Sequence, residues 1–152
     1  NPVPDVYPDD AYPFVIGQVV NLHEGQDVTI IATGETVRGA FDAALELKAA
    51  GISCRVLNMH TIKPLDEAAI LAAAEETGAI LTVEEHSIHG GLGAAVAECV
   101  VQRCPVPMGL LGVPDEPAIP GTSADVFHHY GLDAAGIKRG VHALLKRKGA
   151  GR

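Results

Sequence analysis

One stretch, from Ala79 to Val101, constrains the fold of this chain more than any other. It begins with a short apolar run, Ile80–Val83, that predicts a buried strand, and it continues into a corner of polar residues and glycines, Glu84–Gly93. A helix of small residues is expected from Ala94 onward. In open α/β sheets, ligands and partners usually bind outside the carboxyl ends of the strands, where such corners lie. We therefore expect any site of this chain to lie at this corner.

The same alternation of strand and helix patterns continues along the chain. Apolar runs rich in β-formers predict strands, and apolar residues spaced three and four apart predict helices. The predicted strands are 15–23, 28–32, 53–58, 80–83 and 106–113, and the predicted helices start near 36, 66, 94 and 133. Because strands alternate with helices, we predict an α/β fold with three α/β/α layers and about five strands. The sheet should be mostly parallel with one antiparallel strand.

Two details of this prediction concern the first and last strands. The polar turn Glu24–Asp27 contains glycine and separates two β-rich runs, which favours a hairpin between strands 15–23 and 28–32. Pro105 and Pro107 weaken the last strand, so we expect it at an edge of the sheet.

Composition narrows the class of protein. The chain has 152 residues, which is the length of one domain, and its 47% of hydrophobic residues indicates a globular fold. Its net charge of −8 argues against a nucleic-acid partner, which needs a basic surface. No apolar run approaches the length of a membrane span and no signal peptide is visible, so we expect a cytoplasmic protein. Cys54, Cys99 and Cys104 are expected to be buried free thiols.

The first thirteen residues differ in composition from the rest. Four prolines lie among polar residues, at positions 2, 4, 8 and 13. We predict that residues 1–13 are a linker from an upstream domain and that residues 14–152 form the domain itself. The chain would then be one part of a larger protein.

The glycines at the corner admit two interpretations. Gly90, Gly91 and Gly93 precede a helix and could cradle a phosphate on its free N–H groups. They match neither the dinucleotide nor the Walker pattern, and the carboxylates of Glu84 and Glu85 would repel phosphate. We therefore favour a tight turn that permits close backbone packing.

The polar side chains of the corner also admit two interpretations. Glu84, Glu85, His86 and His89 could form a metal site or an acid–base pair, but their spacing on a loop fixes no geometry. We favour a polar network at a contact between subunits or domains. In that case Gly91→Val should weaken dimerisation and leave the monomer's fold largely intact.

A second loop is expected at the same edge of the sheet. It follows the strand 53–58 and carries His60 and Lys63. His60 could act as a general base, but no serine, cysteine or aspartate motif accompanies it. The chain shows no complete catalytic constellation, and we predict no catalytic, cofactor-binding or metal-binding residue in it. His60 and Lys63 join the predicted contact surface.

In combination, these motifs resemble one known family. The ordered segments are DVTIIATGETVRGA (27–40), CRVLNMHTIKPLD (54–66), ILTVEEHSIHGGLGAAVAE (80–98), GVPDE (112–116) and HHYGLD (128–133). Together they resemble the C-terminal domain of the transketolase family, and most closely the split type, in which the C-terminal half is a separate subunit. The resemblance covers nearly the whole chain.

The resemblance implies a thiamine-diphosphate enzyme that moves a two-carbon ketol unit between sugar phosphates. In this family other domains hold the cofactor: its diphosphate and Mg²⁺ rest on a Gly-Asp-Gly motif, and a glutamate contacts the aminopyrimidine ring. This chain has neither motif. The resemblance therefore implies a domain that supports a homodimer and needs thiamine-binding N-terminal domains or a partner subunit. The isolated chain is expected to be inactive and to bind no thiamine diphosphate.

One loop departs from the family pattern, and two alternatives stay open. Residues 117–121 read Pro-Ala-Ile-Pro-Gly where relatives carry a segment like Phe-Gly-Glu-Ser-Gly. The chain also resembles the equivalent domains of deoxyxylulose-phosphate synthase and of 2-oxo-acid dehydrogenase β subunits, because the segment 61–66 is shared among them. A free-standing interaction or small-ligand module is the alternative from a different class.

Overall fold

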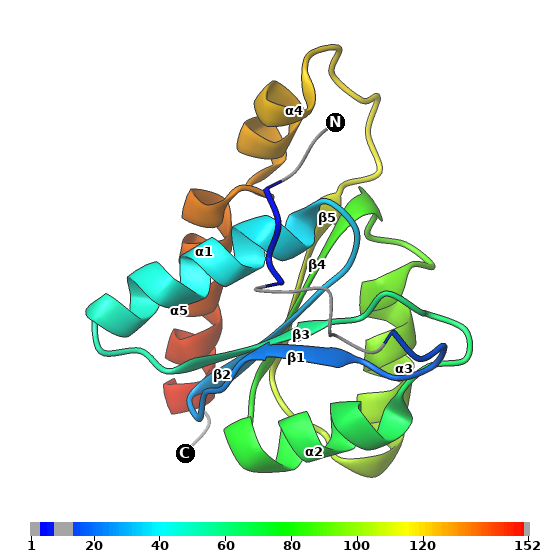
Figure 1. Ribbon diagram of the computed structural model, residues 1–152, viewed down its shortest axis with the longest axis vertical. Helices are drawn as coiled ribbons and strands as arrows, with labels where there is room; N and C mark the ends of the chain where they lie inside the picture. Colours follow the sequence, from blue (N-terminus) through cyan, green and yellow to red (C-terminus); the bar gives the residue numbers. More distant parts are fainter. Residues whose placement is uncertain (1–3, 8–13, 151–152) are drawn as a thin grey trace.

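Strand β2 (Val28–Ala32) is buried at every position, because it lies in the middle of the sheet and is covered on both faces. The computed structural model describes residues 4–7 and 14–150. Within these residues, five strands form one sheet in the order β1-β3-β2-β4-β5 (Figure 1). The strands are β1 (Val20–His23), β2, β3 (Cys54–Asn58), β4 (Ile80–Ser87) and β5 (Met108–Val113).

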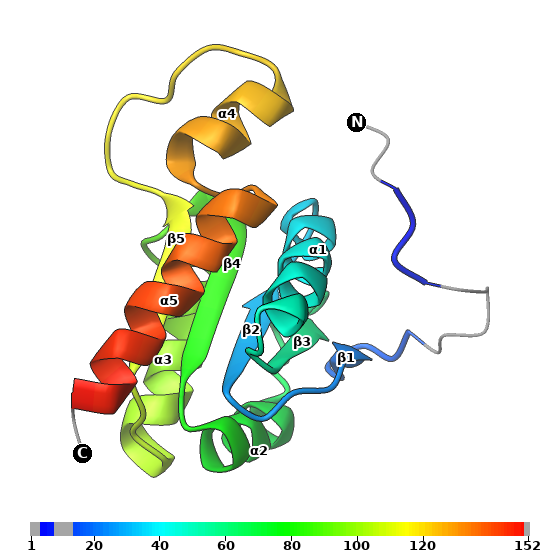
Figure 2. The same ribbon diagram turned by 90° about the vertical axis from the view of Figure 1, so that its left-hand side faces the viewer.

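The helices lie on both faces of this sheet. They are α1 (Thr36–Ala49), α2 (Glu67–Thr77), α3 (Leu92–Arg103), α4 (Ser123–Tyr130) and α5 (Ala134–Ala150). Helices α1 and α5 cover one face and α2 and α3 the other, while α4 stands beyond the end of the sheet (Figure 2). Among the described residues, β1 runs antiparallel to its neighbour and the other strand pairs are parallel. The predicted three-layer α/β/α fold is confirmed.

The alternation of side chains along the strands builds two separate cores. In β2, Ile30 packs with α1 and α5, and its neighbour Ile31 packs with α2 and α3. The same division holds in β4, where Leu81 belongs to the first core and Ile80 to the second. Successive side chains of a strand point to opposite faces, so continuous apolar runs are needed where both faces are covered.

The predicted hairpin is wrong. Strand β1 pairs with β3 instead of β2, because both edges of β2 are taken by its parallel neighbours β3 and β4. The connection between β1 and β2 crosses the start of β3, where the N–H groups of Gln26 and Asp27 bond to the carbonyl of Ser53 at 3.1 and 2.8 Å. A Cβ atom on Gly25 would lie 2.1 Å from the backbone of Cys54, so only glycine permits this close approach.

Strand β4 is longer than the sequence predicted. Residues Glu84–Ser87, interpreted as a polar turn, continue the strand, and Ser87 pairs with Val113 of β5. The strand register shifts between Val83 and Ser87, so the end of β4 departs from regular pairing. Strand β4 therefore extends beyond the carboxyl end of β2, together with β5, and α3 starts at Leu92 rather than at Ala94.

The first strand starts at Val20 rather than near residue 15, and the last starts at Met108 rather than at Val106. The predicted helix ends and caps agree better with the structure. Gly51 and Gly78 follow α1 and α2 with φ of +84° and +64°, the left-handed conformation that favours glycine at helix ends. Asp66 caps α2 through the N–H of Ala69 at 3.1 Å, and the Asp133 carboxylate accepts from the N–H of Gly136 at 2.8 Å in the first turn of α5. Strand β5 lies at an edge of the sheet, as predicted.

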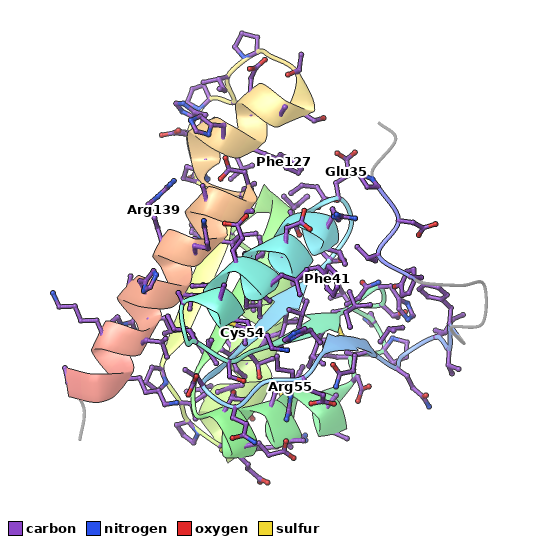
Figure 3. The ribbon with its side chains drawn as sticks, turned by 60° about the vertical axis from the view of Figure 1, so that its left-hand side comes forward. Glu35, Phe41, Cys54, Arg55, Phe127 and Arg139 are labelled. Atoms are coloured by element: carbon purple, nitrogen blue, oxygen red, sulfur yellow. The ribbon has the colours of Figure 1, made fainter. Side chains whose placement is uncertain are left out.

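The three cysteines are free thiols. Cys54 and Cys99 are buried and Cys104 is partly buried. Burial, assisted by the negative charge of Asp27, raises the pKa of the Cys54 thiol to about 12. Cys54 is therefore a neutral side chain of the core at physiological pH, beneath α1 (Figure 3).

A lysine fastens the last helix to the sheet. The Lys148 ammonium donates to the carbonyls of Asp27 at 2.8 Å and Thr77 at 2.6 Å, which joins the end of α5 to the start of β2 and the end of α2. The carbonyl of Thr77 is one of the last in α2, and these lack partners within their own helix. This contact explains one of the basic residues that crowd the C-terminus.

We expect Lys148→Met to lower the free energy of unfolding by about 1–3 kcal/mol, because hydrogen bonds from a charged donor to two carbonyls are lost. Urea unfolding followed by circular dichroism measures this loss. Lys146→Met is the matched control, since Lys146 is exposed on the same helix. Equal unfolding midpoints for the two variants would contradict the role of Lys148.

Candidate functional site

The carboxyl ends of three neighbouring strands form the candidate site. Strand β2 lies between β3 and β4 and runs parallel to both, so the segments that follow these strands meet at one edge of the sheet (Figure 2). His60 follows β3, Gly34 follows β2, and Glu85 lies in the extended end of β4. A Cβ atom on Gly34 would lie 1.9 Å from a carboxylate oxygen of Glu85, which shows how closely these segments approach.

Glu84 is the buried charge of this edge. Its side chain is only 2% exposed, and its two oxygens accept hydrogen bonds from the N–H groups of Leu92 at 2.8 Å and Gly93 at 2.9 Å. These donors belong to the first turn of α3, whose N–H groups have no partner within the helix. The positive end of the helix dipole also favours a carboxylate here. Glu84 therefore fixes the end of β4 to the start of α3 through buried hydrogen bonds.

The glycines of the corner make room for this carboxylate. A Cβ atom on Gly91 would lie 2.0 Å from an oxygen of Glu84, and Gly93 is buried against Leu110 of β5. Gly90 adopts a φ of +74°, a conformation that other residues rarely adopt. The interpretation of these glycines as a packing feature agrees with the geometry, and the first N–H groups of α3 are occupied by Glu84 rather than open to phosphate.

The expectation for Gly91→Val does not hold. A valine side chain would collide with the buried Glu84 carboxylate and separate it from the start of α3. The substitution would therefore disturb the monomer itself, and a loss of dimer would not isolate a contact between subunits.

The remaining predicted contact residues differ in exposure. Glu85, His86, His89 and Lys63 are exposed, whereas Glu84 and Gly93 are buried within this chain. The N–H of His89 bonds to the Ser87 hydroxyl at 3.2 Å, which folds the loop back on the end of β4. The exposed residues remain predicted contacts. The buried Glu84 fixes the backbone of the corner that carries Glu85, His86 and His89.

His60 lines a small cavity at the same edge. Its Nδ1 lies 2.9 Å from the Thr61 hydroxyl, and its buried Nε2 has no hydrogen-bond partner among the described residues. Phe14 packs against the imidazole ring with centroids 5.0 Å apart. The cavity has a volume of about 260 Å³, and its lining comes from β3, the start of α1 and residues 4–7.

Asn58 and Arg38 also line this cavity, although neither was predicted as a site residue from the sequence. Asn58 donates to the Tyr7 hydroxyl at 2.5 Å, and Arg38 donates to the carbonyl of Asp5 at 3.0 Å. These bonds hold residues 4–7, which are part of the predicted linker, beside the N-terminal end of α1. Glu35, labelled in Figure 3, marks this end of the helix. Gly34 could have been predicted from the sequence, because Thr33–Thr36 lies between a predicted strand and a predicted helix, as Gly90–Gly93 does. The other linker residues, 1–3 and 8–13, lie outside the described part.

The described residues contain no group of three or more His, Cys, Asp or Glu side chains that could hold a metal ion. No helix in the described part of the chain is long and apolar enough to cross a membrane.

Comparison with known proteins decides the family. The family model described as "Transketolase, C-terminal domain" matches residues 17–137 of this chain. The chain belongs to the transketolase C-terminal domain family. A solved structure titled "Split gene transketolase, inactive beta4 tetramer" superposes on 96% of the chain with a TM-score of 0.88 and 39% identity, and the matched part is 48% of that chain.

Curated relatives of this transketolase domain include subunits of split enzymes. The chain is 51% identical over 145 residues to a subunit of the apulose-4-phosphate transketolase of Phocaeicola vulgatus, and the match covers 95% of this chain and 46% of that protein. It is 46% identical over 135 residues to the 6-deoxy-6-sulfo-D-fructose transketolase subunit SqwH of Clostridium sp., covering 89% of this chain and 42% of that protein. The chain thus spans about half the length of these relatives.

A second group of relatives matches the open alternative. The chain is 42% identical over 137 residues to 1-deoxy-D-xylulose-5-phosphate synthase 1 of Geobacter sulfurreducens, covering 89% of this chain and 22% of that protein. The same domain therefore occurs in enzymes with different names, and the identities favour the transketolase subunits.

The residues of this transketolase domain do not fit a resident thiamine diphosphate. The helix N-terminus that could receive a diphosphate already holds the Glu84 carboxylate, and the carboxylate of Glu85 lies at the same edge of the sheet, against Gly34. Two carboxylates without a metal would repel a diphosphate.

We expect Glu84→Gln to lower the free energy of unfolding by about 1.5–3 kcal/mol, because an amide offers one acceptor in place of two charged oxygens. Glu85→Gln is the matched control on the next residue and should change it by less than about 0.5 kcal/mol, as is usual for exposed positions. Urea unfolding of both variants measures the difference. Similar losses in the two variants would show that Glu84 does not hold the corner.

Proposed function

We propose that this chain is the C-terminal domain of a split transketolase, which transfers a two-carbon ketol unit between sugar phosphates together with thiamine-binding domains. The observation that carries this proposal is the match to the apulose-4-phosphate transketolase subunit over 95% of the chain. The architecture agrees with a supporting role, since its buried carboxylate closes the corner where a phosphate could otherwise bind.

The partners of this proposed enzyme follow from the same relatives. We propose an N-terminal subunit or domain that holds thiamine diphosphate and Mg²⁺, because the relatives are named as subunits and the start of α3 already holds the Glu84 carboxylate. We also propose that copies of the chain associate, first as a homodimer. The solved relative is titled a tetramer, which supports self-association of this kind of subunit.

The sugar substrate is a separate proposal. The two split relatives are named for apulose 4-phosphate and 6-deoxy-6-sulfofructose, so related subunits serve sugars outside the pentose phosphate pathway. We propose a phosphorylated or sulfonated ketose as the donor. A place in the pentose phosphate pathway and a cytoplasmic location stay predictions.

The test is a ketol-transfer assay on the full polypeptide that contains this chain. We expect activity when it is mixed with the thiamine-binding subunit from the same source and thiamine diphosphate, and none for residues 1–152 alone. Calorimetry should show no cofactor binding to residues 1–152, because the N–H groups at the start of α3 are occupied. Formation of 1-deoxy-D-xylulose 5-phosphate by the mixture would favour the synthase instead. Micromolar binding of thiamine diphosphate to residues 1–152 would contradict the supporting role.

A further inference from the structure

Residues 4–7 form a short strap on the surface of the domain, beside α1 (Figure 1). Two hydrogen bonds hold the strap in place. Asn58 donates to the Tyr7 hydroxyl at 2.5 Å, and Arg38 donates to the carbonyl of Asp5 at 3.0 Å. The strap therefore joins the end of β3 to the first turns of α1 through side chains, and it takes no part in the sheet.

The strap leaves empty space beneath it. The cavity of about 260 Å³ that His60 lines is also lined by all four residues of the strap. A second cavity, of about 340 Å³, is lined by Pro4 and Arg38 and extends to α4. Val6 is the strap side chain that packs against the core beneath α1. Because close packing supplies the dispersion energy of a contact, a segment that borders two cavities is weakly held.

Docking of the strap has a cost at His60. Tyr7, Phe14 and His60 pack edge to face in succession, with ring centroids 5.2 and 5.0 Å apart. The Nε2 atom of His60 is shielded from solvent and has no hydrogen-bond partner among the described residues. A buried nitrogen without a partner destabilises the state that buries it, because its hydrogen bond to water is lost.

We infer that residues 4–7 are a releasable strap, and that the unpaired Nε2 of His60 opposes its docking. The bonds from Asn58 and Arg38 favour the docked state. Release of Tyr7 removes its support from Phe14, so water reaches the imidazole and Nε2 gains a partner. Few contacts separate the two states, so both are populated.

Release changes where a preceding domain is attached, a step that rests on the proposed function and its thiamine-binding domain. With the strap docked, the chain before residue 4 leaves the domain next to α4, because Pro4 lines a cavity together with Ser123 and Phe127. With the strap released, the attachment moves to Phe14, beside His60. Each freed residue adds up to about 3.5 Å of reach. Docking therefore fixes a preceding domain near α4, and release lets it move.

Thiol labelling of the full polypeptide that contains this chain tests the inference. In a Cys104→Ser background, Val6→Cys places a thiol on the strap where docking shields it. Its reaction with N-ethylmaleimide is followed on the peptide that contains it, by mass spectrometry. The buried thiols of Cys54 and Cys99 report unfolding of the domain in the same sample. We expect Val6→Cys to react faster than Cys54 and more slowly than in denaturant.

Two variants should change this rate in opposite directions. Tyr7→Phe removes one of the two hydrogen bonds of the strap, so Val6→Cys should react about two- to tenfold faster. His60→Phe removes the unpaired nitrogen and keeps a ring in the stack, so the reaction should be about two- to tenfold slower. His86→Phe is the matched control, because His86 is exposed at the same edge and should leave the rate unchanged.

Three results would overturn the inference. Equal rates for Val6→Cys and Cys54 would show that the strap leaves only when the domain unfolds. An unchanged rate in Tyr7→Phe, or a rate in His60→Phe that is not lowered, would remove the balance itself. Circular dichroism shows whether His60→Phe remains folded, and Tyr7→Phe decides if it does not, because it alters only the strap. The ketol-transfer assay tests the proposed function separately, since its outcome does not depend on these rates.

Discussion

Strand β2 lies between two parallel neighbours and under helices on both faces, so neither its main chain nor its side chains reach water. Buried main-chain groups must find partners within the protein, and those of β2 find them in β3 and β4. This requirement displaces β1 to the far side of β3, although β1 precedes β2 in the chain. It also brings the carboxyl ends of β3, β2 and β4 together at one edge.

That edge would be an anion site in many α/β proteins, because helix N-termini meet strand ends there. Here a carboxylate of the chain itself occupies the position. Glu84 accepts from the first turn of α3, and glycine at position 91 leaves space for it. The result is a rigid corner that presents Glu85, His86 and His89 outward, which suits contact with other domains better than cofactor binding.

This geometry agrees with the proposed role of the chain as the C-terminal part of a split transketolase. The chain spans about half of its split relatives, and the start of α3 already holds the Glu84 carboxylate. Residues 4–7 lie beside α1 through Asn58 and Arg38, at the edge that also carries His60. A domain with the proposed supporting role needs such contacts more than it needs catalytic groups.

The sequence by itself determined the layers, the helix ends and the family. Apolar runs with period two or 3.6 mark strands and helices because burial on one or two faces requires them, and Gly51, Gly78 and Asp66 mark ends through local backbone conformation and capping. Only the tertiary structure decided that β1 pairs with β3, that Glu84 lies inside, and that Asn58 and Arg38 hold residues 4–7. These outcomes depend on which groups compete for the same partners across the sheet, and no local pattern records that competition.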